Sequence, residues 1–117
     1  MAPTDKNKAD KENEEKLAPL RKGLLEMAVL KVVSSKAAYA ADILERLNST
    51  PFKTQEGTLY PLLSKLRREE LVKYEWVESE AGPPRKYYSL TKDGEATLKE
   101  LSDYFKTLQT AINNINK

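Results

Sequence analysis

The sequence has 117 residues, of which 20 are Lys or Arg and 18 are Asp or Glu, so the formal net charge is +2. It contains no Cys and no His, which excludes disulfides, thiolate or imidazole metal sites and the most common nucleophiles and general bases. The length suits one domain with flanking segments, and no apolar run matches a membrane span or a signal peptide; we therefore expect a cytoplasmic protein without metal or cofactor.

Residues 2–15 hold no apolar side chain larger than Ala and show no periodicity. We therefore expect residues 1–16 to form a disordered or fraying arm. Residues 17–33 carry apolar side chains at helical spacing around most of the circumference, which predicts a helix that is buried on more than one side. Such a helix needs a second surface to cover it, for example another subunit.

Residues 39–47 predict a short helix, and residues 48–51 predict a turn. The central expectation is a third helix within residues 55–70, because leucines recur there at i, i+3, i+4 and i+7: Leu59, Leu62, Leu63 and Leu66. The opposite side of this helix offers hydroxyl, phenol and cationic groups. Groups of these types contact phosphate oxygens and base edges in DNA complexes.

The start of this third helix is open from the sequence alone. Thr54 or Gln55 could be its N-cap, and Thr is the better capping residue of the two. Pro61 has no backbone N–H to donate, so the helix either begins later, with Thr58 as its cap, or carries a mild kink over Gly57.

Residues 71–77 alternate in polarity and are rich in residues that favour strands, and residues 85–90 are expected to form a second short strand. Residues 78–84 form the turn between them, where Gly82 supplies conformational freedom. This hairpin directly follows the helical pair, an order typical of a wing whose Arg and Lys side chains lie along a DNA backbone. A hairpin that only covers the core is the alternative.

Thr91 is the expected N-cap of a last helix that reaches about residue 115. Its apolar positions are spaced 3, 4, 3, 4 and 3 residues apart: Leu98, Leu101, Phe105, Leu108, Ile112 and Ile115. This narrow seam predicts pairing with a second copy of the chain, and folding back onto the first helix is the alternative. The predicted fold class is mainly α with a small β-hairpin: a winged helix-turn-helix over residues 17–91, then a C-terminal dimerisation helix over residues 92–117.

Two motifs, EGTLYP at residues 56–61 and GPPRKYY at residues 82–88, closely resemble the PadR family of bacterial transcriptional regulators. The resemblance covers about residues 20–101. Glu70 and Ala38 are departures, because the family usually has Gly at these positions. The resemblance implies a homodimer, built by its C-terminal helix, that represses transcription by binding an operator. The single terminal helix is similar to the small subfamily.

The resemblance assigns DNA contacts to one group of residues: Tyr39, Thr58, Tyr60, Lys65, Arg85 and Lys86. The exposed side of the third helix and the clustering of positive charge add another group: Lys53, Ser64 and Arg68. The expected partners are double-stranded DNA and a second copy of the chain. A two-fold dimer would recognise an imperfect palindrome with half-sites about 34 Å apart, or a multiple of it.

Drug- or phenol-responsive relatives imply a small aromatic effector at the subunit interface, where Tyr104 and Phe105 are the candidate residues. Plain packing is the alternative role for both. Two other classes of function were weighed. A winged helix that binds only proteins is disfavoured by the cationic side of the third helix. An enzyme is not expected, because Glu69 and Glu70 point about 100° apart on a helix and do not converge.

Overall fold

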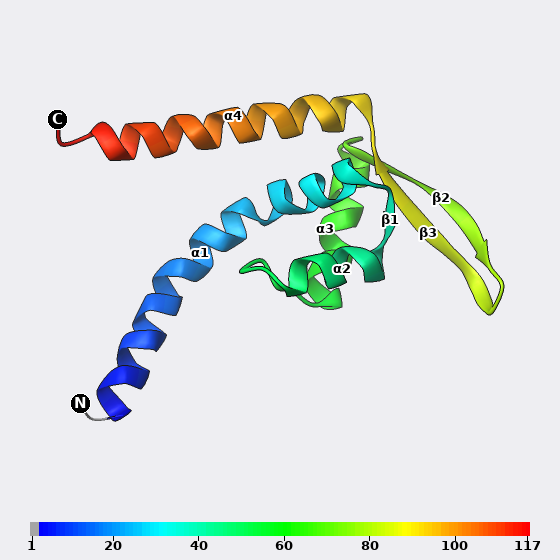
Figure 1. Cartoon of the computed structure of the whole chain (residues 1–117). Coiled ribbons are helices and arrows are strands. Elements are labelled where there is room, and N and C mark those ends of the chain that lie inside the picture. The colour runs from blue at the N-terminus through cyan, green and yellow to red at the C-terminus, as the bar shows by residue number, and fades with distance from the viewer. Residues whose placement is uncertain (1–2) are drawn as a thin grey trace.

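A computed structural model describes residues 3–117 of the chain (Figure 1). The elements follow in this order: α1 Pro3–Ser35, β1 Ala38–Tyr39, α2 Ala40–Asn48, α3 Glu56–Arg68, β2 Val72–Ser79, β3 Gly82–Leu90 and α4 Lys92–Asn114. Figure 1 shows α1 and α4 leaving the body on one side, while the β2–β3 hairpin projects on the other. The predicted fold class, mainly α with a small wing, is confirmed.

The first helix is longer than the sequence pattern predicted. It begins at Pro3, so the structure differs from the expected disordered or fraying arm over residues 1–16; residues 1 and 2 lie outside the described residues. The polarity of this segment suggested disorder, but its many Lys, Glu and Ala residues are also good helix formers. Toward the body of the protein, Leu17 and Leu20 remain 50% and 61% exposed.

The core lies where α1, α2, α3 and the base of the hairpin meet. The largest fully buried side chains come from these elements: Val29, Leu30, Ile43, Leu59, Leu63, Leu66 and Val72. The predicted leucine stripe of α3 therefore faces inward, with Leu62 half-buried at its edge. Because the leucine stripe packs into the core, the opposite side of α3 faces solvent.

The start of α3 settles the alternatives that the sequence left open. Gln55 is the N-cap, and its carbonyl oxygen accepts hydrogen bonds from the N–H groups of Thr58 at 3.0 Å and Leu59 at 2.9 Å. Pro61 lies inside the helix, where its ring leaves the carbonyl of Gly57 without its usual donor. Both residues are exposed, so water can hydrate that carbonyl group.

The sheet has three antiparallel strands in the order β1–β3–β2. Strand β1 was not predicted, because a two-residue strand has no alternation of polarity to detect. Ala38 pairs with Tyr88 and Tyr39 with Tyr87. The hairpin is also longer than predicted, because residues 82–84, expected in the turn, belong to β3. Pairing through β1 ties the start of α2 to the hairpin.

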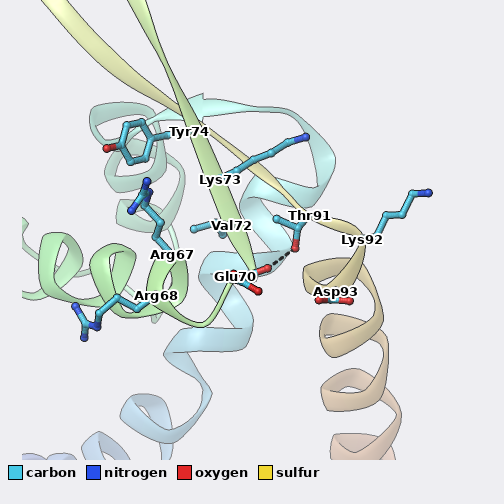
Figure 2. Close-up of a pocket in the computed structure, with 9 residues that line it drawn as sticks. All are labelled: Arg67, Arg68, Glu70, Val72, Lys73, Tyr74, Thr91, Lys92 and Asp93. Atoms are coloured by element: carbon cyan, nitrogen blue, oxygen red, sulfur yellow. Dashed lines mark hydrogen bonds between the residues drawn. The ribbon is translucent and has the colours of Figure 1, made fainter.

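The end of α3 is closed by two backbone hydrogen bonds. The N–H of Leu71 donates to the Leu66 carbonyl and that of Glu70 to the Arg67 carbonyl, each at 2.9 Å, the pattern of a Schellman motif. Glu70 has a φ of 61°, a left-handed conformation that favours Gly. Its carbonyl accepts a 2.6 Å hydrogen bond from the Thr91 hydroxyl, which joins this turn to the start of α4 (Figure 2).

Replacing Glu70 with Gly is expected to stabilise the protein. The left-handed conformation costs a non-Gly residue about 1–2 kcal/mol, and the greater flexibility of Gly in the unfolded chain offsets part of this gain. We expect the free energy of unfolding in urea to rise by about 1 kcal/mol for Glu70→Gly. Glu69→Gly is the matched control, because Glu69 has a right-handed φ of −81° and Gly there should destabilise. Equal effects of both substitutions would contradict the strain argument.

The last helix divides into two parts. Thr91 is its N-cap as predicted, with the side chain accepting a 2.9 Å hydrogen bond from the N–H of Gly94. Leu98, predicted in the dimerisation seam, is only 8% exposed, because it packs into the core of its own chain. Phe105 is half-buried. The other seam residues are exposed: Leu101 36%, Leu108 43%, Ile112 69% and Ile115 77%. Within residues 3–117, no helix is long and apolar enough to cross a membrane.

Candidate nucleic-acid interface

The solvent side of α3 follows from its buried leucines. At about 100° per residue, the positions opposite the core are Gly57, Pro61, Ser64 and Arg68. Tyr60 flanks them on the side of the hairpin and is 49% exposed. Thr58 and Lys65 flank them on the other side. The helix therefore presents hydroxyl, phenol and cationic side chains to solvent, together with Gly57 and Pro61, which have no polar side chain.

A cavity of about 290 Å³, which we call the wing cleft, lies between α2, α3 and the hairpin. It is lined by Tyr39, Ala40, Ala41, Tyr60, Ser64, Trp76, Arg85, Lys86 and Tyr88. Five predicted DNA-contact residues from three elements thus share one cavity: Tyr39, Tyr60, Ser64, Arg85 and Lys86. The β1–β3 pairing explains the place of Tyr39, since it holds the start of α2 beside the hairpin.

Aromatic rings position the two cations of the wing cleft. The guanidinium carbon of Arg85 lies 4.3 Å from the ring centroid of Tyr39. The Lys86 ammonium lies 4.6 Å from the ring centroid of Tyr74 and 5.6 Å from that of Trp76. Such stacking orients a cation and leaves N–H groups available to an incoming phosphate. The cleft therefore combines an aromatic lining with positively charged groups at defined positions.

Lys65 does not join the wing cleft. Its ammonium group donates a 3.1 Å hydrogen bond to a carboxylate oxygen of Glu26 on α1. This hydrogen bond, together with the attraction of the Glu26 charge, raises the pKa of Lys65 above its ordinary value. The helical pattern of α3 could not reveal this partner, because Glu26 lies 39 residues earlier in the chain.

The remaining predicted contacts are dispersed. Lys53 is exposed in the connection before α3, and Thr58 is exposed in the first turn of that helix. Arg68 is exposed in the last turn and borders a second hollow of about 690 Å³, the joint hollow, lined by Arg67, Arg68, Glu70, Val72, Lys73, Tyr74, Thr91, Lys92 and Asp93. Figure 2 shows its cationic side chains pointing in different directions. The joint hollow therefore lacks a convergent set of cations for one anion.

Two residues near the interface were missed from the sequence. Trp76 lines the wing cleft and is 61% exposed. The guanidinium of Arg67 lies 4.7 Å from the ring centroid of Tyr74, on the hairpin side of α3. The alternation of β2 held a usable signal for Trp76, since it shares a strand face with Val72 and Tyr74. The place of Arg67 depended on how α3 packs against β2.

A separate groove of about 280 Å³ runs between α1 and α4. It is lined by Gly23, Leu24, Glu26, Met27, Leu101, Tyr104, Phe105 and Leu108. The two candidate effector residues, Tyr104 and Phe105, therefore lie in one apolar groove with a single carboxylate. That carboxylate belongs to Glu26, the partner of Lys65 on α3. Among the residues whose side chains the structure describes (11 and 13–117), no cluster of three or more acidic side chains is arranged to hold a metal ion.

The chain is similar to known proteins in sequence and in structure. The chain matches the transcriptional regulator PadR-like family over residues 29–100. It is 44% identical to a PadR-like transcription factor from Bacteroides fragilis, with a TM-score of 0.75, over 86% of this chain and 98% of that one. A PadR family transcriptional regulator from Eggerthella lenta is 28% identical, with a TM-score of 0.85, over 93% of this chain and 96% of that one.

A PadR-like transcriptional regulator from Bacillus cereus is 33% identical to this chain, with a TM-score of 0.72. The match covers 82% of this chain and 94% of that one. The family match spans both motifs on which the resemblance was based, at residues 56–61 and 82–88.

Proposed function

The chain belongs to the transcriptional regulator PadR-like family, and from this premise we propose that it is a repressor that binds a palindromic operator as a homodimer. The observation that carries this proposal is the wing cleft, which gathers Tyr39, Tyr60, Ser64, Arg85 and Lys86 on one side. In this proposal α3 enters the major groove, and the hairpin lies along the adjacent backbone. Phosphate contacts by the cations position the protein, and the α3 side chains contact base edges.

The homodimer proposal is supported by apolar surface that the single chain leaves uncovered. Leu108, Ile112 and Ile115 of α4 are exposed, as are Leu17 and Leu20 of α1. Exposed apolar side chains on two helices that leave the body on the same side fit an interface with a second copy (Figure 1). A two-fold arrangement would present two α3 helices to half-sites about one helical turn, or a multiple of it, apart.

We extend the proposal to a small aromatic effector in the groove between α1 and α4. The groove has apolar walls, with Tyr104 and Phe105 among its lining residues. It also reaches Glu26, which bonds to Lys65 on the recognition helix, so an occupant could disturb a group next to the DNA. Titration of the protein–DNA complex with a panel of planar dyes tests this part, and an absence of DNA release across the panel would count against it.

The DNA-binding proposal is tested by fluorescence anisotropy with a labelled duplex from upstream of the protein's own gene. We expect selective binding relative to an unrelated duplex, with an affinity that falls steeply as salt increases, because phosphate contacts release counterions. Arg85→Gln should weaken binding to both duplexes and reduce the salt slope by about 1.

Lys99→Gln is the matched control, because it removes the same charge from α4, where Lys99 is paired with Asp103 at 2.9 Å. This variant should bind DNA like the unmodified protein. Equal weakening by Arg85→Gln and Lys99→Gln would contradict the proposed role of the wing cleft. Weak and equal binding of both duplexes would instead favour a protein-interaction role.

A further inference from the structure

Trp76 is the only Trp in the chain, and its indole is unusually accessible. Side chains alternate between the two faces of a strand, so Trp76 shares a face of β2 with Tyr74 and with Val72, which is only 2% exposed. This face starts in the core and continues outward along the hairpin. Trp76 lies on the part of this face that is outside the core, and 61% of the residue is exposed.

The indole is nevertheless held in place. Its ring meets that of Tyr74 edge-on, with centroids 5.9 Å apart and planes at 86°. Across the hairpin Trp76 pairs with Lys86, whose ammonium lies 5.6 Å from the indole ring. The rest of the indole borders the wing cleft, which it shares with Tyr60 of α3. A fixed and exposed aromatic ring loses little conformational freedom when a partner covers it.

The composition of the wing cleft indicates what this partner must offer. Trp76 and Tyr60 provide apolar surface, while Arg85 and Lys86 provide positive charge within the same cavity. A DNA strand supplies the complementary pattern, because apolar deoxyribose faces alternate with phosphates along it. The exposed apolar residues Leu17, Leu20, Leu108, Ile112 and Ile115 belong to α1 and α4. These helices extend away from the hairpin (Figure 1), so a dimer built on them does not cover Trp76.

We propose that Trp76 contacts DNA directly, with its indole packed against deoxyribose of the strand between the groove occupied by α3 and the groove beside the hairpin. This inference rests on the proposed DNA-binding function. Lys86, which pairs with Trp76 across the hairpin, binds a phosphate next to the sugar that the indole covers, and Arg85, on the other face of the hairpin, binds another phosphate of the same strand. The contact adds affinity without distinguishing one base sequence from another, because every nucleotide carries the same sugar.

The test combines two signals in one titration of the full-length protein. Anisotropy of the labelled duplex reports binding, and emission of the single Trp reports the environment of residue 76. We expect the emission to shift to shorter wavelength as the duplex binds. Trp76→Ala should weaken binding by about 10-fold, the scale of one lost aromatic contact with a nucleotide. The factor should be equal for the promoter and unrelated duplexes, and the salt slope should be unchanged because no charge is removed.

Two further variants sharpen the test. Trp76→Phe retains an aromatic ring and should recover part of the lost affinity, and Val77→Ala, on the other face of β2, should bind like the unmodified protein. Unchanged Trp emission together with full-affinity binding by Trp76→Ala would overturn this inference and leave DNA binding intact. Absence of any anisotropy change with the unmodified protein would instead reject DNA binding itself, and this inference with it. Because the indole is largely exposed, urea unfolding of Trp76→Ala should match that of the unmodified protein.

Discussion

Gly94→Ala is expected to lower the free energy of unfolding by about 2 kcal/mol, since overpacking against a backbone group outweighs the gain in helix propensity. Gly94 is buried in the first turn of α4. A Cβ atom at this position would overlap the carbonyl oxygen of Leu71 and lie 3.0 Å from its carbonyl carbon and 3.2 Å from Cδ2 of Leu90. The carbonyl belongs to the backbone, so α4 or the start of the hairpin must move.

This movement is costly because the same joint holds several hydrogen bonds. The N–H of Thr91 donates to the Leu71 carbonyl at 3.1 Å, and the Thr91 hydroxyl donates to that of Glu70 at 2.6 Å (Figure 2). Displacing α4 therefore strains the connection between α3, the hairpin and α4 itself.

Urea unfolding at a fixed protein concentration measures the effect of Gly94→Ala, because dimerisation would make stability depend on concentration. Gly57→Ala is the control. Gly57 is also helical, but a Cβ there would meet no atom within 4 Å, so Ala should be neutral or stabilising. If Gly94→Ala unfolds at the same urea concentration as the unmodified protein, the packing of α4 against Leu71 is looser than described.

The sequence predicted those elements whose signals are local. The leucine stripe of α3 and the N-cap at Thr91 each depend on residues within one or two turns, and the structure has both. The hairpin was predicted for the same reason, since alternation is visible within residues 71–77 and turn residues directly follow them. What these patterns do not contain is the identity of the neighbour that each element packs against.

The structure differs from the prediction where an element packs against a distant segment of the chain. Leu98 fits the apolar seam of α4, but its partner is the core of its own chain. Strand β1 exists only through pairing with β3, from residues about 50 positions later. Lys65 was correctly predicted on the exposed side of α3, yet its ion pair with Glu26 depends on how α1 crosses that helix. A helical wheel gives the direction of a side chain and cannot supply a partner from a distant segment.

At the candidate interface, too, residues with local signals were predicted and a residue whose exposure depends on the whole fold was not. Tyr60, Arg85 and Lys86 were predicted from their places in two motifs. Ser64 was predicted from the exposed side of the third helix, and the fold brings all four residues to one cavity. Trp76 was not among them, because alternation gives the face of the strand on which a side chain lies and not whether that face is covered. Its exposure became visible only when the length of the hairpin and the limit of the core were known.

The double substitution Leu108→Glu/Ile112→Glu is expected to convert the proposed dimer to a monomer. Leu108 and Ile112 are 43% and 69% exposed in the single chain, so charged side chains there should leave the chain folded. In a dimer interface they would place four carboxylates against apolar surface, a desolvation cost that a reversible interface does not tolerate. Light scattering should give the mass of two chains for the unmodified protein and of one chain for the variant.

Loss of the dimer should also weaken operator binding on the order of 100-fold, because a monomer binds one half-site without the second contact. Thr107→Glu/Thr110→Glu is the matched control: it adds the same charge to the same helix, on the side away from the seam at about 100° per residue. Since both variants carry equal net charge, a difference in operator binding between them reports the interface and not repulsion from DNA. If the Leu108/Ile112 variant retains the mass of two chains, or if both variants lose operator binding equally, the dimer does not form through this part of α4.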